Sequence, residues 1–259
     1  MKFDQLTDEF DPNVPDLSPG VARLLSVLAN DEVEIDEVVD TIRLYPVICA
    51  RLIGLANSAW SSPDDTVTDL KTTCIRLGLG VVRSSSVAYA VAAPFDPTRC
   101  RGFDPARFWC CSLLAADAAD HLADRHAIDP SLARTGAMLR NLGLLWLADA
   151  APTATEQALA IQAGDEQGGL ADALSSTIGA THLQASQHLF RAWGLPADLL
   201  DACERESTSP IASICRLSSN AAVDVYMGTT RCSTDADKIK THLAKSAERI
   251  LSIAQSISS

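Results

Sequence analysis

The segment from Thr135 to Leu147 constrains the fold of this chain more than any other. It reads Thr-Gly-Ala-Met-Leu-Arg-Asn-Leu-Gly-Leu-Leu-Trp-Leu, so a helix here would carry apolar residues on nearly every side. Such a helix is stable only when it is buried all round. The rest of the chain is therefore expected to pack against this segment. Arg140 and Asn141, a cation and an amide, stand at the middle of the apolar run.

Composition predicts an all-α protein. The chain has 259 residues, enough to bury roughly three quarters of its unfolded surface in a compact form. Hydrophobic residues make up 47% of it, yet only 5% are aromatic, and Ala and Leu are abundant. This balance favours close-packed helices over strands, which prefer β-branched and aromatic residues.

Charge and cysteine usage exclude several classes of protein. The net charge of -12 repels a phosphate backbone and an anionic membrane surface, and no Lys/Arg cluster is longer than two residues, so neither nucleic acid nor membrane is an expected partner. No apolar run approaches the length of about 18 residues that a membrane span needs. The acidic start, Met1 to Glu9, does not resemble a signal peptide, and the eight cysteines form no CxxC motif. We expect a cytoplasmic protein with reduced thiols.

Proline and glycine divide the chain into about a dozen helical segments. Residues 1–16 are rich in Asp and predict a flexible acidic N-terminal segment. Residues 17–257 are expected to form a single domain with two lobes, an N-terminal helical lobe over 17–94 and a C-terminal lobe over 104–257. The boundary lies in the loop from Pro94 to Pro105, where the composition changes.

The C-terminal lobe is predicted to begin with a long helix from the Asp104-Pro105 cap to about Arg125. One face of this helix carries four metal-ligand types at helical spacing, namely Asp117, Asp120, His121 and Asp124. Such a face could present a carboxylate and an imidazole to one ion. It is also the polar half of an amphipathic helix, and a solvated face is the preferred interpretation.

A series of short motifs resembles the HDOD family, a branch of the HD-domain phosphohydrolase superfamily that keeps the helical scaffold and usually lacks the complete metal site. The resemblance runs from Pro15 to about Ile257, and the motifs are specific in their combination and order. They are Leu17-Ser18-Pro19, Tyr45-Pro46, Arg51 to Ala59, Arg76-Leu77-Gly78, Phe108-Trp109, Leu142-Gly143-Leu144, Gly179 with His182, and Trp193 to Pro196.

The resemblance implies that the metal site of HD hydrolases is degenerate here. Cys111 falls where the first His is expected, and Arg140 and Asn141 replace the His-Asp pair. A fixed cation about 4 Å from a divalent ion would cost about 8 kcal/mol at an effective dielectric constant of about 20. We therefore expect no metal, no cofactor and no catalytic residues, unless the Arg140 side chain turns away from the site.

Four other residues are candidates for a ligand-binding or partner-binding surface: Asn57, Ser58, His182 and Trp193. Each also has a structural interpretation. Asn57 could cap the end of a helix, His182 could be a core histidine with one hydrogen bond, and Trp193 could anchor the helix that follows it against the apolar segment.

Together these features predict a bacterial-type, non-catalytic HDOD protein of signal transduction, which acts through a protein partner or a small regulatory ligand. The alternative is a divergent metal-dependent phosphohydrolase that acts on a nucleotide or a cyclic dinucleotide with ligands outside the degenerate positions. Fold-level analogy supports this alternative only weakly, because function depends on sites and not on folds.

Overall fold

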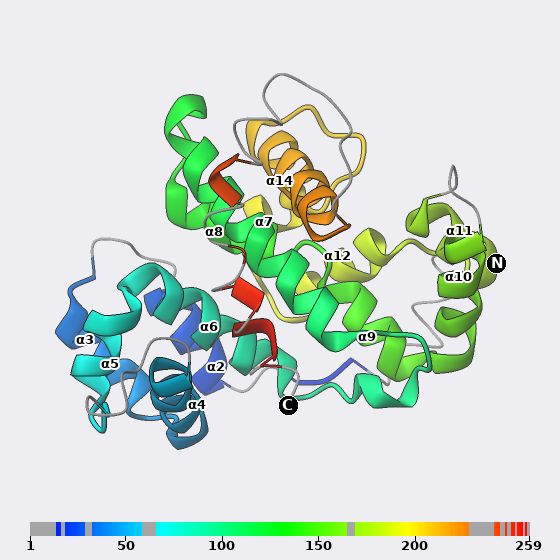
Figure 1. Cartoon of the computed structure of the whole chain (residues 1–259). Coiled ribbons are helices and arrows are strands. Elements are labelled where there is room, and N and C mark those ends of the chain that lie inside the picture. Colours follow the sequence, from blue (N-terminus) through cyan, green and yellow to red (C-terminus); the bar gives the residue numbers. More distant parts are fainter. Residues whose placement is uncertain are drawn as a thin grey trace.

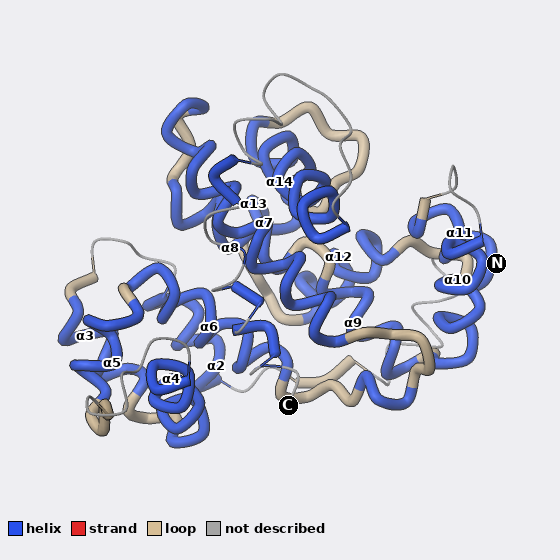
Figure 2. Tube along the Cα trace, in the orientation of Figure 1, coloured by secondary structure: helices blue, strands red, loops and turns tan. Residues whose placement is uncertain are grey.

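The structure, a computed structural model, describes residues 14–16, 19–28, 33–58, 66–164 and 169–227, and within 241–257 residues 241–243, 247, 250–251, 253–255 and 257. The described chain consists of helices and connecting loops without a strand, as Figure 2 shows. The prediction of an all-α fold is confirmed. Most of the predicted acidic N-terminal segment, residues 1–13, lies outside the described residues. No described helix combines the length and the apolar character needed to cross a membrane.

The first helices form one group, at the lower left of Figure 1. Its members are α2 (Pro19–Leu28), α3 (Ile35–Ile42), α4 (Pro46–Ser58), α5 (Leu70–Leu77) and α6 (Leu79–Ala92). The residues that these helices bury are mainly Leu, Val and Ile, such as Leu24, Ile42 and Leu52. Asp69 begins α5 by accepting a hydrogen bond from the Thr72 N–H at 2.8 Å, which satisfies one of the free amides of the first turn.

A second group contains the remaining helices and holds the candidate site. In chain order these are the 3-10 helix η2 (Pro97–Arg99), α7 (Pro105–His126), α8 (Pro130–Leu139), α9 (Leu142–Ala150), α10 (Pro152–Gly164), α11 (Leu170–Thr177), α12 (His182–Ala192), α13 (Ala197–Ala202) and α14 (Pro210–Met227). The long helix α7 packs against α8 and α14, and α9 packs against α12. Asp104 and Pro105 begin α7 as the sequence predicts, since the Asp104 carboxylate accepts the Arg107 N–H at 3.0 Å.

The apolar segment from Thr135 to Leu147 is buried, but it is not one helix. Helix α8 ends at Leu139 and α9 begins at Leu142, so Arg140 and Asn141 form the junction between the two. The apolar residues of both helices belong to the core. The prediction of a buried centre is correct, while a single helix through it is wrong.

The end of the chain returns to the middle of the molecule. The described residues within 241–257 are helical, and Leu243, Ile250 and Ile253 are buried. In Figure 1 this part, coloured red, lies between α6 and α7. The C-terminal residues thus add apolar contacts between the two groups of helices.

Candidate functional site

The four residues Cys111, Arg140, Asn141 and His182 line one cavity of about 830 Å³. Helix α7 supplies Cys111, the α8–α9 junction supplies Arg140 and Asn141, and the first residue of α12 is His182. A pocket of this size is large enough for a small organic ligand. The structure therefore brings the three degenerate positions together with His182, one of the four surface candidates.

Arg140 is buried, and its hydrogen bonds are made with backbone carbonyls. Its guanidinium donates to the carbonyl of Ala202, at the end of α13, and to that of Glu204 at 3.4 Å. The last carbonyls of a helix have no partner within the helix and carry partial negative charge, so a guanidinium stabilises them. Burial lowers the pKa of Arg140 from its usual high value, an effect to which the nearby Arg216 cation also contributes. Arg140 therefore joins the α8–α9 junction to the end of α13.

The junction is held on its other side by helix α12. The Ser186 hydroxyl oxygen accepts the Gly143 N–H at 2.8 Å, and the hydroxyl lies 2.7 Å from the Arg140 carbonyl, which it can reach as a donor. Gly143 approaches the backbone of α12 so closely that a Cβ atom would lie 2.3 Å from the His182 carbonyl oxygen. Only glycine allows this approach. The orientation of Arg140 and Asn141 thus depends on direct contact between α9 and α12.

His182 contributes a neutral imidazole to the cavity. The residue is half-buried, but its Nδ1 atom is fully enclosed and has no hydrogen-bond partner among the described residues. Burial, together with the cations of Arg140 and Arg205, lowers the pKa of His182 to about 4. At neutral pH the ring is therefore uncharged and offers one nitrogen lone pair.

The side chains at the degenerate positions do not fit a divalent metal ion. Zinc binds cysteine as thiolate, and burial raises the pKa of the Cys111 thiol to about 12 in the metal-free protein, so an ion would first have to displace this proton. Arg140 supplies a cation where the superfamily has an imidazole, and Asn141 supplies at most one neutral oxygen. Within the described ranges no group of three or more His, Cys, Asp or Glu residues is placed to hold a metal ion.

The remaining surface candidates lie away from this cavity. The Asn57 amide donates to the Val67 carbonyl and accepts the Val67 N–H, both at 2.8 Å, so it closes the connection between α4 and α5. The half-buried Trp193 donates its indole N–H to the Pro15 carbonyl at 2.7 Å and lies 6.4 Å from Phe95, ring centre to ring centre. Ser58 ends α4, and its side chain lies outside the described residues.

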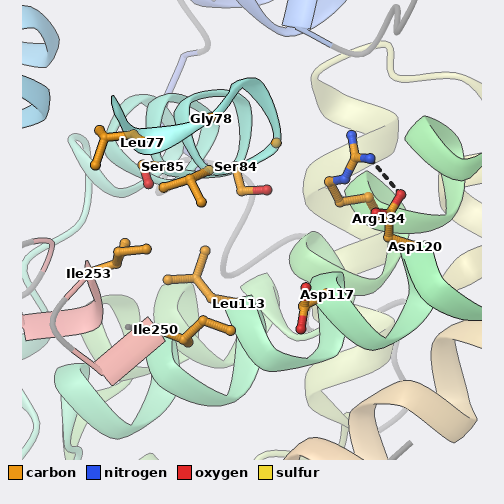
Figure 3. A pocket seen from close by; sticks show the side chains of 12 residues that line it. Leu77, Gly78, Ser84, Ser85, Leu113, Asp117, Asp120, Arg134, Ile250 and Ile253 are labelled. Carbon is orange, nitrogen blue, oxygen red and sulfur yellow. Dashed lines mark hydrogen bonds and ion pairs between the residues drawn. The ribbon is translucent and has the colours of Figure 1, made fainter. Parts of the chain in front are cut away.

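A second, smaller cavity of about 290 Å³ lies between α6, α7 and the end of the chain (Figure 3). It is lined by Asp117 and Asp120, the residues predicted to lie on a solvated face of α7. Asp120 forms an ion pair with Arg134 of α8, and Asp117 lies 3.0 Å from His242. Both carboxylates stay partly exposed, at 38% for Asp120 and 34% for Asp117, and they contact residues of other segments. His121 stacks on His242 with ring centres 4.4 Å apart.

Three further arginines line the larger cavity without any signal in the sequence, namely Arg107, Arg205 and Arg216. They come from α7, from the loop after α13 and from α14, which lie far apart in the sequence. No local motif joins them, and only the packing of α14 against α7 and α13 brings them to one place.

Comparisons with known proteins agree with this fold. Several solved structures resemble the chain, among them the following three. A presumptive phosphohydrolase from Shewanella amazonensis is 20% identical, with a TM-score of 0.72 over 97% of this chain and 98% of that one. A presumptive signal transduction protein from Marinobacter aquaeolei is 17% identical, with a TM-score of 0.79 over 98% of this chain and 61% of that one. An HDOD domain protein of unknown function from Geobacter sulfurreducens is 18% identical, with a TM-score of 0.69 over 98% and 96%.

No curated protein matches the chain. Identities below 25% indicate a shared fold and do not transfer an activity. The family model of the HDOD domain, in contrast, matches residues 14–209, which is most of the chain and includes the whole α8–α9 junction. The chain belongs to the HDOD domain family.

Proposed function

We propose that this chain is a non-catalytic regulatory HDOD protein, which acts in signal transduction by binding a protein partner or a small regulatory ligand. The observation that carries the proposal is the state of Arg140. Its buried guanidinium replaces a metal-binding imidazole and bonds to the carbonyls of Ala202 and Glu204.

Two features of the cavity support this proposal over hydrolysis. A metal-dependent phosphohydrolase needs several unprotonated N or O ligands to hold the ion and to activate water. Cys111 is protonated, and Asn141 lacks the negative charge of the aspartate that it replaces. The nearby Arg140 and Arg216 add positive charge, which disfavours a divalent cation.

The experiment measures metal content and turnover on the purified protein. Elemental analysis is expected to find no stoichiometric Mg, Mn, Fe or Zn, and bis(p-nitrophenyl) phosphate is expected to remain intact when each metal is supplied. The variant Cys111→Ser tests the cavity, and Cys49→Ser, at a half-buried thiol in α4, is its matched control.

Metal-dependent hydrolysis by the wild-type protein, lost in Cys111→Ser and kept in Cys49→Ser, would show that the site is catalytic. Metal-dependent hydrolysis that persists in Cys111→Ser would establish the alternative of a divergent phosphohydrolase with ligands outside the degenerate positions. If none of the three proteins hydrolyses the substrate, the result supports the regulatory function.

A further inference from the structure

The larger cavity concentrates positive charge in a protein whose net charge is -12. Four arginines line it, against two carboxylates, those of Asp104 and Asp224. The four arginines are Arg107, Arg140, Arg205 and Arg216. The Asp104 carboxylate already accepts a backbone N–H, because this residue caps α7. The cavity is thus a cationic region within an acidic molecule.

Two of these cations, Arg140 and Arg216, form no ion pair with a carboxylate of the described residues, although the Glu204 carboxylate lies near enough to Arg140 to raise its pKa. The guanidinium of Arg216 donates to the carbonyls of Arg205 and Ser207 at 3.3 and 3.1 Å, and that of Arg140 also bonds only to carbonyls. Arg205 differs, since it pairs with Asp172 at 3.0 Å and with Glu206 at 3.7 Å. The Arg216 cation lies close enough to Arg140 to repel it and lower its pKa. An anion between them would remove this repulsion.

Neutral polar groups stand beside these cations. The enclosed Nδ1 of His182 is without a hydrogen-bond partner. The side chain of Asn141 does not cap α9, although this residue stands at the N-cap. An unsatisfied buried polar atom is unfavourable, so a ligand that bonds to it would gain free energy.

Apolar side chains from four helices also line the cavity. Leu144, Leu159 and Leu170 come from α9, α10 and α11, and Leu217 and Val223 come from α14. Leu217 and Val223 are exposed, at 44% and 43%, so the apolar wall continues to the rim. Apolar surface next to fixed cations is suited to a ligand that has both kinds of group.

From this arrangement we infer that the cavity binds an amphipathic organic anion, with a compact anionic head group at Arg140 and Arg216 and an apolar body on the leucine wall. The inference rests on the proposed function, because a site that does not turn over a substrate is free to retain a regulatory ligand. It also specifies the chemical class of that ligand.

The test uses a pair of fluorescent probes that differ in charge. The amphipathic anion 8-anilinonaphthalene-1-sulfonate carries a sulfonate, and N-phenyl-1-naphthylamine is its neutral analogue. Each is titrated into the folded protein while its fluorescence is measured. We expect saturable binding of the anion, and weaker binding of the neutral analogue.

Substitutions then locate the site. Arg216→Gln removes one charged donor and should weaken binding of the anion by about tenfold or more, while Arg216→Lys keeps the charge and should retain most of it. The matched control is Arg191→Gln, at an exposed arginine in the last turn of α12. Binding of the neutral analogue should not respond to any of the three.

A second variant tests the inference in case Arg216→Gln does not fold. Leu217→Glu places a carboxylate at the exposed rim and should weaken binding of the anion, whereas Leu44→Glu, at an exposed position in the other helix group, should not. Equal affinity of all variants for the anion, or equal affinity of the wild type for both probes, would overturn the inference. Metal-dependent turnover without these charge effects would overturn the proposed function as well, so the two failures can be told apart.

Discussion

The contact between α9 and α12 makes a sharp prediction about Gly143. In Gly143→Ala the new Cβ atom would lie 2.3 Å from the His182 carbonyl oxygen and from the Ser186 nitrogen, and 2.7 Å from the Ala185 carbonyl carbon. These are backbone atoms of a regular helix, so no side-chain rotation can relieve the overlap. The two helices must move apart.

The expected loss of stability follows from two terms. Overpacking of a core commonly costs about 1 to 3 kcal/mol, and a clash with backbone on the opposite side should lie at the upper end of this range. Separation of the helices also weakens the hydrogen bond between the Gly143 N–H and Ser186, worth about 1 kcal/mol. We expect a loss of about 4 kcal/mol, against a typical total of about 5 to 15.

Urea unfolding followed by tryptophan fluorescence measures this loss. The matched control is Gly54→Ala, within α4, where an added Cβ has no heavy atom within 4 Å. This control should stabilise the protein by about 0.5 to 1 kcal/mol, because alanine loses less backbone entropy in a helix. If Gly143→Ala unfolds at the same urea concentration as the wild type, the close approach of α9 and α12 is refuted.

Three further predictions concern the candidate residues. Asn57→Ala should lower the free energy of unfolding by about 2 kcal/mol and speed hydrogen exchange at the Val67 amide, since both hydrogen bonds between them are lost; unchanged exchange would contradict this. Trp193→Phe should lower the free energy of unfolding in urea by about 1 kcal/mol through loss of the bond to Pro15, and stability equal to that of the wild type would contradict it. The pKa of His182 is lowered to about 4 in the folded state, so the unfolded chain takes up a proton first as the pH falls, and stability should decrease between pH 6.5 and 4. Unfolding curves of His182→Gln should lack this part of the pH dependence, and an identical pH profile would refute the assignment.

Local signals allowed much of the fold to be predicted from the sequence. The Asp104-Pro105 pair marks the start of α7 because an aspartate cap and a proline suit the first turn whatever packs around it. The break at Arg140 and Asn141 was missed, since the residues on both sides are apolar and periodicity does not distinguish one buried helix from two. The contacts of Asp117 and Asp120 could not be predicted for a related reason. Their partners, His242 and Arg134, belong to other segments, and amphipathic patterning cannot reveal a polar contact between elements.

The same limit applies to the candidate site. Cys111, Arg140 and Asn141 could be grouped from the sequence because they fall within motifs, and the structure places them in one cavity, whereas Arg216 and Arg205 reach this cavity only through tertiary packing. The sequence pattern of α14 does not indicate that Arg216, in the second turn of this helix, faces a cavity.

The hydrogen bonds of Arg140 give the α8–α9 junction a structural role. A metal ion bound at such a junction would hold several helices together through its ligands. In this chain Arg140 connects the same elements by covalent attachment to the junction and by hydrogen bonds to the carbonyls of Ala202 and Glu204. Because the cation is part of the chain, the arrangement of α8, α9 and α13 does not depend on metal supply. Arg140 can therefore stabilise the scaffold and also present positive charge to the cavity.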